Sequence, residues 1–419
     1  MTVKLDPFIA DKRIVFNEAR NIAKAAHAEA GNPLEVSAKT HEVVANVLAN
    51  KDIFITPAAR KILDQVAAAK VAEKAIDPTH KTKLFKTDEP MQLKLTADFA
   101  KLFAEKQGAG HDPGLSGTLQ VGDKQIPVNV RTRGQSSLQY LPEPKIKLKL
   151  DKAARQGTDF ENEGSLEIGV QGGKGGKDGL GRVLIPEAPP REAATYALLE
   201  EMGLPVSHSR LANFDYVDAQ GVTRTQPAFL NEAVDSLAQR YYGDKGVALS
   251  EGAGGVPVEV TLQTKDVLRM NLGQLLIGNR DWSFNVNGDK SKPTVTANSG
   301  MMHNSKLIYG PDPIHPEGMP VAADFDLSLF VLQNEYGGYW KNHPASPTQP
   351  INYASELTQM RSQYPGPQFD EVLGDVIKHQ ETMLKRLDQY RLDDASKAFI
   401  RNQVTGFMTA AQAELKPAA

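Results

Sequence analysis

The segment Val321-Ala-Ala-Asp-Phe-Asp-Leu-Ser328 decides the fold, because it sets two aspartates directly after a short apolar run. Two earlier segments repeat this arrangement, Gly278-Asn-Arg-Asp-Trp-Ser283 and His303-Asn-Ser-Lys-Leu-Ile308. Each brings carboxylate or amide oxygens beside apolar residues, and hard divalent cations such as Mg²⁺ take oxygen ligands. We expect one residue from each segment to reach a common site: Asp281, Asn304 and Asp324.

These residue types are the ones that phosphoryl transfer requires. One aspartate on a loop orients or deprotonates the acceptor hydroxyl, while an asparagine and a second aspartate bind the metal that neutralises the phosphates. A lysine on a strand of the other lobe holds the nucleotide phosphates, and the segment Lys145-Ile-Lys-Leu-Lys-Leu-Asp151 offers three. The order along the chain is lysine strand, helix, two strands and then the three segments, and it favours this interpretation.

Each of these residues also has a simpler structural explanation. Asp281 could cap a helix, since aspartate is favoured there. Asp324 and Asp326 could be turn residues, and Asn304 could bond its own backbone. Alternate lysines on a strand are typical of a solvated face. The order in which all of them occur together disfavours these explanations as a set.

Hydrophobic periodicity changes along the chain and indicates the fold class. Alternation of apolar and polar residues predicts antiparallel strands at 91–95, 119–121, 126–130, 145–151, 210–217 and 226–231. Helical patterns follow at 189–202, 265–278 and 370–415. Strands first and helices later indicate an α+β fold with segregated lobes.

The same patterns divide the chain into three regions. Residues 1–85 are rich in Ala, Glu and Lys, and we expect a helical N-terminal region without chemistry of its own. Residues 86–231 are expected to form a β-rich N-lobe, and residues 232–419 a mostly helical C-lobe with the metal and catalytic loops.

A glycine-rich basic segment at 164–181 resembles a phosphate-binding loop at first sight. The spacing of a P-loop is not met, because Asp178 follows the last lysine where Ser or Thr is required. We therefore expect a flexible surface loop.

Composition excludes several classes of function. The formal net charge of −3 gives no excess of Lys and Arg for binding nucleic acid, and no run approaches the roughly 20 apolar residues of a membrane span. With no cysteine there can be no thiolate nucleophile or Cys-ligated metal. Early charges such as Lys4, Asp6 and Asp11 predict no signal peptide. Localisation therefore stays open: we expect a cytoplasmic protein for this sequence, or an exported one where a signal was trimmed.

Several motifs resemble the CotH-type spore-coat kinases, an atypical protein-kinase-like family, and above all its uncharacterised bacterial relatives. Gly134-Gln-Ser-Ser137 followed by Pro144–Leu150 resembles the family's turn and basic strand. The segments Ile277–Ser283, His303–Ile308 and Asp324–Asp326 resemble three motifs of those relatives. The resemblance spans about residues 88–400 and leaves out the N-terminal region.

The resemblance implies a two-lobed kinase-like fold and a role for individual residues. Asp281 would be the catalytic-loop aspartate, and Asp324 and Asn304 the metal ligands. Lys147 would hold the nucleotide phosphates, with Lys149 as the alternative. Glu232 falls where the hinge between the lobes is expected.

Two departures from the family of ordinary kinases stand out. About twenty residues separate Asp281 from Asn304, whereas the asparagine of ordinary kinases follows the aspartate by five positions. Residues 285–300 look like an insertion, which leaves Asn285 as a rival metal ligand. The glycine-rich loop of ordinary kinases is also missing.

These observations predict an ATP-dependent enzyme that uses Mg²⁺ or Mn²⁺ to transfer the γ-phosphate to a hydroxyl of a protein substrate. Two alternatives stay open. The same site could transfer the nucleotidyl group to its acceptor, or the chain could be a non-catalytic binding module on a kinase scaffold.

Overall fold

The computed structural model divides the chain into two compact units, residues 1–77 and residues 78–419. The structure describes residues 13–14, 19, 35–37, 44–45, 47–49, 54–68, 70–72, 78–104, 114–134, 141, 143, 145–169, 185–243, 246–250, 259–287, 290–291, 293–295, 302–310, 317–337, 351–364 and 366–415.

The composition of the first unit predicts a helical region, but its described residues form strands as well as a helix. Its described elements are β1 (Arg13–Ile14), β2 (Glu35–Ser37), β3 (Phe54–Ile55), α4 (Pro57–Ala68) and β4 (Lys70–Ala72). The strands pair in parallel, β1 with β3 and β2 with β4. Helix α4 begins at a proline, a residue well suited to a first turn, and buries Ala59, Leu63 and Val66.

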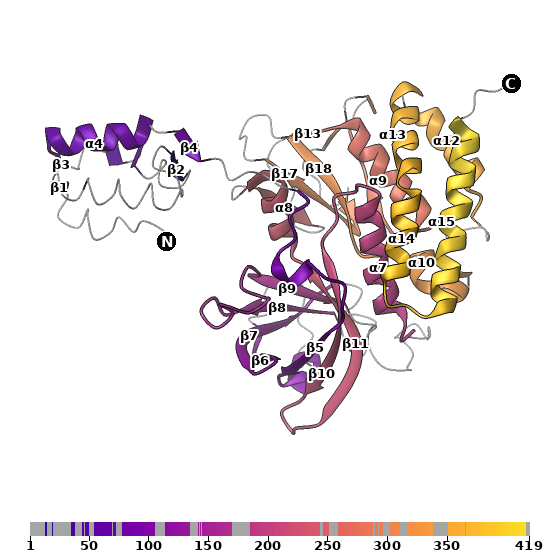
Figure 1. Cartoon of the computed structure of the whole chain (residues 1–419), viewed down its shortest axis with the longest axis horizontal. Coiled ribbons are helices and arrows are strands. Elements are labelled where there is room, and N and C mark those ends of the chain that lie inside the picture. The colour runs from indigo at the N-terminus through magenta and orange to yellow at the C-terminus, as the bar shows by residue number, and fades with distance from the viewer. Residues whose placement is uncertain are drawn as a thin grey trace. The chain divides into compact units, whose positions relative to one another are not determined.

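The second unit begins with a seven-stranded closed barrel (Figure 1). Its strands are β5 (Met91–Thr96), β6 (Leu115–Val121), β7 (Lys124–Thr132), β8 (Ile146–Leu150), β9 (Ser165–Gly169), β10 (Ser209–Val217) and β11 (Thr223–Glu232). Neighbouring strands are antiparallel except β5 and β10, whose parallel pairing closes the barrel. The predicted antiparallel strands are therefore confirmed, and the parallel pair that closes them into a barrel was not predicted.

Alternation explains which residues fill the barrel. On β8, Ile146, Leu148 and Leu150 are buried, while Lys147 is half-buried and Lys149 exposed. The helical turns η1 (Lys83–Phe85) and α5 (Phe99–Ala104) add Leu84, Phe85 and Phe99 to the same core.

The expectation of a surface loop at 164–181 is wrong for its first part. Residues 165–169 form β9, and four of its five residues are buried. The glycine content of the segment favoured a loop in the sequence analysis, whereas β9 is a strand buried on both faces. Residues 170–181 lie outside the described residues.

The rest of the second unit combines helices with a five-stranded sheet. The helices are α7 (Ala188–Glu201), α8 (Val234–Tyr242), α9 (Thr264–Leu276), α10 (Leu329–Leu332), η4 (Gln333–Glu335), α12 (Tyr353–Gln363), α13 (Gly366–Lys378), α14 (Gln380–Gln389) and α15 (Asp394–Leu415). The sheet has the order β12 (Val247–Ser250), β17 (Ser305–Tyr309), β18 (Glu317–Ala322), β13 (Val260–Leu262) and β15 (Thr294–Val295). Two short strands, β14 (Ser283–Phe284) and β16 (Met302–His303), pair separately.

The mixed α+β class is thus confirmed, with a β-rich part followed by a largely helical part. Two details differ from expectation. The C-terminal part contains a sheet, and the long helical pattern at 370–415 is three helices with breaks before Gln380 and Asp394. No helix in the described part of the chain has the length and apolar character needed to span a membrane.

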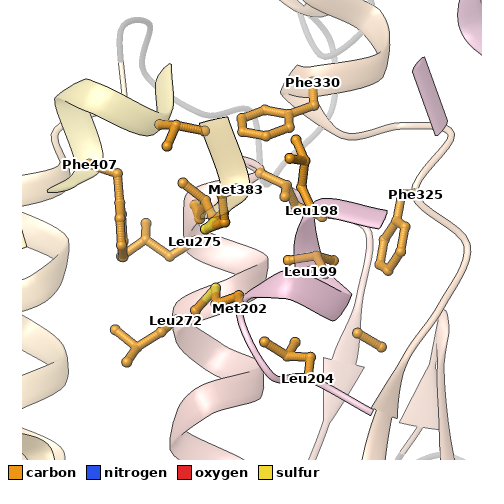
Figure 2. Packing of buried hydrophobic residues seen from close by; sticks show 14 of the residues in the cluster. Leu198, Leu199, Met202, Leu204, Leu272, Leu275, Phe325, Phe330, Met383 and Phe407 are labelled. Carbon is orange, nitrogen blue, oxygen red and sulfur yellow. The ribbon is translucent and has the colours of Figure 1, made fainter. Parts of the chain in front are cut away.

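Helix α7 joins the barrel to the helical core. It contacts β10 and β11 on one side and α10 and α14 on the other. Figure 2 shows Leu198, Leu199 and Met202 of α7 packed among side chains from α9, α10, α14 and α15. Because α7 is buried on most of its surface, its polar residues are held at fixed places inside the molecule.

Candidate functional site

Asp324 and Asp326 follow strand β18, and between them in the chain stands Phe325, whose ring is buried. Phe325 is fully buried, and its ring centroid lies 4.5 Å from that of Tyr196 on α7. Asp324 and Asp326 on either side of it keep about a quarter of their side chains exposed. Both carboxylates are thereby held at one place.

A lysine from the barrel meets both of these aspartates. The Nζ of Lys145 bonds to Oδ1 of Asp324 and lies 3.0 Å from Oδ2 of Asp326. The lysine side chain is only 5% exposed. Burial by itself lowers the pKa of Lys145, but Asp324 and Asp326 raise it well above its ordinary value. The ammonium group is therefore charged at neutral pH.

Helix α7 fixes the backbone of the aspartate segment. The N–H of Asp324 donates to the hydroxyl of Tyr196 at 3.0 Å, and the N–H of Phe325 donates to Oε1 of Glu192 at 3.2 Å. Asp324 has a φ of 56°, in the left-handed region. A non-glycine residue in that region costs about 1 kcal/mol or more and persists where the surroundings hold it in place. Here Tyr196 and Lys145 supply that hold.

Several carboxyl groups surround Lys145. Burial, opposed by the lysine, raises the pKa of Asp326 and raises the pKa of Glu192 to about 8. The pKa of Asp324 is lowered, because Lys145 and Arg133 outweigh the effect of burial. The carboxyl group closest to the lysine is thus ionised, while its neighbours resist ionisation.

A second set of charges lies beside the first. Arg133, just after β7, lies 2.9 Å from Oε2 of Glu167 on β9, and Lys306 on β17 lies 3.7 Å from the same oxygen. Burial opposes ionisation of Glu167, but Arg133 and Lys306 lower its pKa to about 2. Because Lys306 belongs to the C-terminal part and Arg133 to the barrel, this cluster also links the two parts.

The third aspartate is held by residues far away in sequence. Asp281 lies after α9, and its N–H donates to Oδ1 of Asn279 at 3.0 Å. Nδ2 of Asn304 donates to Oδ2 of Asp281 at 2.9 Å and to its carbonyl oxygen at 2.7 Å. Nε2 of His303 lies 3.2 Å from Oδ1. Both carboxylate oxygens therefore have partners.

The pairing of β14 with β16 explains this long-range contact. Ser283 pairs with His303, and the hydroxyl of Ser305 donates to the carbonyl of Ser283 at 2.7 Å. Asn304 adopts a φ of 46° between β16 and β17, so the chain turns there and its amide reaches Asp281. The wide sequence spacing of Asp281 and Asn304 is thus bridged by a strand pair.

The remaining candidates lie elsewhere. Lys147 is the register partner of Glu167 on the neighbouring strand β9, and Lys149 is exposed. Asn285 is exposed directly after β14. Glu232 ends β11 where the chain leaves the barrel for α8, and its Oε2 lies 2.9 Å from Arg240 and accepts from the N–H of His208. Their predicted roles remain predictions.

Four residues at the site carry contacts that sequence reasoning did not assign to them: Lys145, Glu192, Tyr196 and His303. The sequence held a partial signal for the lysine, since Lys145 shares a face with the two lysines that follow it. Glu192 and Tyr196 are spaced one helical turn apart on α7, a spacing that also fits an ordinary buried helix.

The residues at the site are chemically suited to a divalent metal. Among the described residues, no group of three or more His, Asp or Glu side chains is arranged to hold a metal ion. However, Asp324 and Asp326 offer carboxylate oxygens that share one lysine partner. Such oxygens would hold a cation such as Mg²⁺ or Mn²⁺, and further ligands would come from amide oxygens or phosphate.

No protein-family model and no curated protein matches the chain. Among solved structures, it is similar to the crystal structure of a Helicobacter pylori proinflammatory kinase, CtkA, with 10% sequence identity and a TM-score of 0.34. The similarity covers 75% of this chain and 96% of that one. This distant similarity in structure assigns the chain to no family and to no activity. The resemblance to CotH-type kinases stays a prediction from the motifs.

Proposed function

We propose that this chain is a metal-dependent phosphotransferase that moves the γ-phosphate of ATP to a hydroxyl group of a protein. One observation carries the proposal: a buried lysine from the barrel contacts two aspartates from the C-terminal part. A cation and metal-binding oxygens thus meet at one place, as phosphoryl transfer requires.

We assign the phosphate-binding role to Lys145 rather than to Lys147 or Lys149. Lys145 is charged and buried, and it contacts the proposed metal ligands directly. Lys147 lies on β8 opposite Glu167 of β9 and has no contact with these aspartates among the described interactions, and Lys149 is exposed. When phosphate oxygens enter, the ammonium group can exchange one carboxylate partner for them without losing its charge compensation.

Asp324 and Asp326 would hold the metal, with Asn304 offering its amide oxygen and Asn285 as the alternative amide. The amide nitrogen of Asn304 already donates to Asp281, which leaves its oxygen as the ligand atom. Bound there, the metal would neutralise charge on the phosphates.

Asp281 would receive or orient the proton of the acceptor hydroxyl. Hydrogen bonds from Asn304, together with the contact to His303, hold its carboxylate in one orientation. A fixed carboxylate is what a general base or an orienting group needs, because misplacement is costly in such reactions. His303 would act here as a positioning residue for Asp281.

Labelled ATP tests the proposal. The full chain is incubated with Mg²⁺ or Mn²⁺, ATP labelled in the γ- or the α-phosphate, and a hydroxyl-bearing protein acceptor such as casein, and all proteins, including the chain itself, are analysed by mass spectrometry. We expect protein-bound label from the γ-phosphate only.

The other outcomes are equally informative. Label from the α-phosphate would replace the proposal with nucleotidyl transfer. Absence of any label, together with no binding of ATP by calorimetry under either metal, would support the non-catalytic binding module.

A further inference from the structure

A cavity of about 200 Å³ lies between α9 and α12, beside the loop that carries Asp281. Arg280 and Trp282 line it, whereas Asp281 between them contacts His303 and Asn304. The cavity is therefore separate from the Lys145 site, and it touches the same short loop from another direction.

Its walls come from two helices with regular spacing. Glu356, Gln359, Met360 and Gln363 lie three, four and seven residues apart on α12, so they share one face of that helix. Asn271 and Leu275 on α9 are separated by four residues and form the facing wall. Such walls are built on regular elements and keep their shape.

The cavity calls for a neutral ligand. The one acidic and the one basic side chain in its lining are paired, since Arg280 lies 2.5 Å from Oε1 of Glu356. Most of the other polar lining consists of carboxamides, which have both hydrogen-bond donors and acceptors. The Oε1 of Gln363 already accepts from Nζ of Lys290, which also lies 4.7 Å from the ring centroid of Tyr364, so Gln363 offers a ligand its amide nitrogen.

A buried amide in the lining needs a partner. Asn279 is 3% exposed, and its Oδ1 accepts the N–H of Asp281. Its Nδ2 is buried and has no hydrogen-bond partner among the described residues. Buried donors of this kind are nearly always satisfied in native proteins, by protein, water or ligand. An acceptor group of a bound molecule would satisfy it.

Aromatic and apolar surface completes the lining. Trp282 and Tyr364 contribute rings, and Leu275 and Met360 contribute aliphatic surface. The volume is below the roughly 300 Å³ at which pockets begin to hold drug-sized ligands. A single planar ring system therefore fits better than a whole nucleotide.

We infer that this cavity binds the base of a nucleoside, with its ring against Trp282 and its polar edge on the carboxamides. Asn and Gln side chains bond the edges of bases, and aromatic side chains stack on their faces. An aromatic side chain of a peptide would fill the same volume but would offer no acceptor to Asn279. The inference goes beyond the proposed function and does not depend on it.

Occupation of the cavity has a consequence for the loop. A base stacked on Trp282 would restrain residues 280–282, and Asp281 is the middle residue of the three. The site would thus bias the position of Asp281 through its two neighbours in the chain.

Tryptophan fluorescence tests the inference directly. The chain has two tryptophans, so Trp340→Phe leaves Trp282 as the single reporter. Adenosine, guanosine, cytidine and uridine are titrated separately, with ribose and N-acetylphenylalanine amide as competing probes. We expect saturable quenching by at least one nucleoside and none by ribose.

Variants locate the binding site. Two variants, each made in the Trp340→Phe background, are Gln359→Ala and Gln363→Ala. Each should lower the affinity for the quenching nucleoside about tenfold, which is the effect of one lost hydrogen bond. Gln389→Ala, an exposed glutamine on α14, should change nothing. Lys145→Met should also leave the affinity unchanged, because that lysine belongs to the other site.

Three results would overturn the inference. One is the absence of quenching by all four nucleosides. Another is quenching that survives both glutamine variants and disappears in Lys145→Met, which would place the base at the proposed ATP site. The third is binding of N-acetylphenylalanine amide as tight as that of any nucleoside, which would make the cavity a pocket for a peptide side chain.

Discussion

At the scale of single residues, the site brings together a buried lysine and several carboxyl groups whose interactions with it oppose the cost of burial. Lys145 attracts Asp324 and Asp326, while burial, with contributions from these two aspartates, raises the pKa of Glu192 to about 8. Removing water strengthens every one of these interactions. A divalent cation entering here would meet the two carboxyl groups that Lys145 contacts.

Asp281→Asn separates chemistry from binding. The amide keeps the size of the side chain and can still accept from Asn304, so the fold should survive. It cannot take the proton of an acceptor hydroxyl, and we expect transfer to fall by about 10²- to 10⁴-fold. Nucleotide binding measured by calorimetry should match the parent.

The structural explanation of Asp281 gives the opposite result. Asn and Asp are nearly equal as helix caps. A variant with the parental transfer rate would mean that Asp281 has no catalytic role.

Tyr196→Phe tests how Asp324 is held. The variant leaves the N–H of Asp324 without its acceptor, which costs about 1–3 kcal/mol when the group stays buried. We expect a lower melting temperature and weaker metal binding. Tyr241→Phe on α8 is the matched control. Equal melting temperatures for the two variants would show that the Tyr196 hydroxyl does not hold the segment.

Single residues also mark how far sequence reasoning could go. The types Asp, Asn and Asp in three motifs were enough to find Asp281 and Asn304 in mutual contact. Which lysine meets Asp324 could not be found, because three lysines alternate along residues 145–149 and only the tertiary packing selects Lys145. The contact of His303 with Asp281 depends on a strand pair that local patterns do not encode.

At the scale of elements, one buried carboxyl group links the start of the second unit to the barrel. Glu163, just before β9, is 1% exposed and accepts a hydrogen bond from Thr82, just before η1. Burial, with a contribution from Glu232, raises its pKa to about 7. The folded protein therefore keeps this group protonated in a range where the unfolded chain ionises it.

This link predicts how stability depends on pH. A carboxyl group whose pKa is higher in the folded state makes the fold less stable as pH rises from about 4.5 to 7. The full loss is about 3 kcal/mol, from a shift of roughly two and a half pKa units. Glu163→Gln should remove about 3 kcal/mol of this dependence and leave the part that comes from Glu192, whose pKa is also raised, whereas Glu161→Gln should keep the whole dependence. Melting curves at pH 4.5 and 7.5 measure it, and parallel losses in parent and Glu163→Gln would contradict it.

Elements with strong local signals were predictable and others were not. Helix α7 has Pro189 in its first turn and glycine at 203 after its end, and both signals act through the backbone alone. Strand β9 was missed because its segment is rich in glycine. The five-stranded sheet was missed because β12 and β13 have only four and three residues, too few for a periodic pattern.

At the scale of the whole molecule, the barrel, α7 and the helical core form one unit that begins at Pro78. The closing pair β5–β10 joins residues more than a hundred positions apart, which no local pattern predicts. The expected boundary at residue 85 falls after η1, whereas η1 packs in the barrel core.

A truncated protein tests this division. Residues 78–419 contain both hydrophobic cores of the proposed site, so we expect them to fold alone. The fragment should melt cooperatively and bind metal and ATP as the full chain does. Loss of cooperative melting in the fragment would mean that residues 1–77 are needed for the fold of the second unit.

The most direct measurement is calorimetric titration of ATP into the full chain, with and without Mg²⁺ or Mn²⁺, for the parent, Lys145→Met and Lys147→Met. We predict that the parent binds ATP only with a divalent metal and that Lys147→Met binds nearly as well. Lys145→Met should bind ATP at least tenfold more weakly, because it removes the ammonium group that lies against Asp324 and Asp326 in the parent. ATP binding that ignores the metal, or that is lost in Lys147→Met and kept in Lys145→Met, would contradict the proposed site.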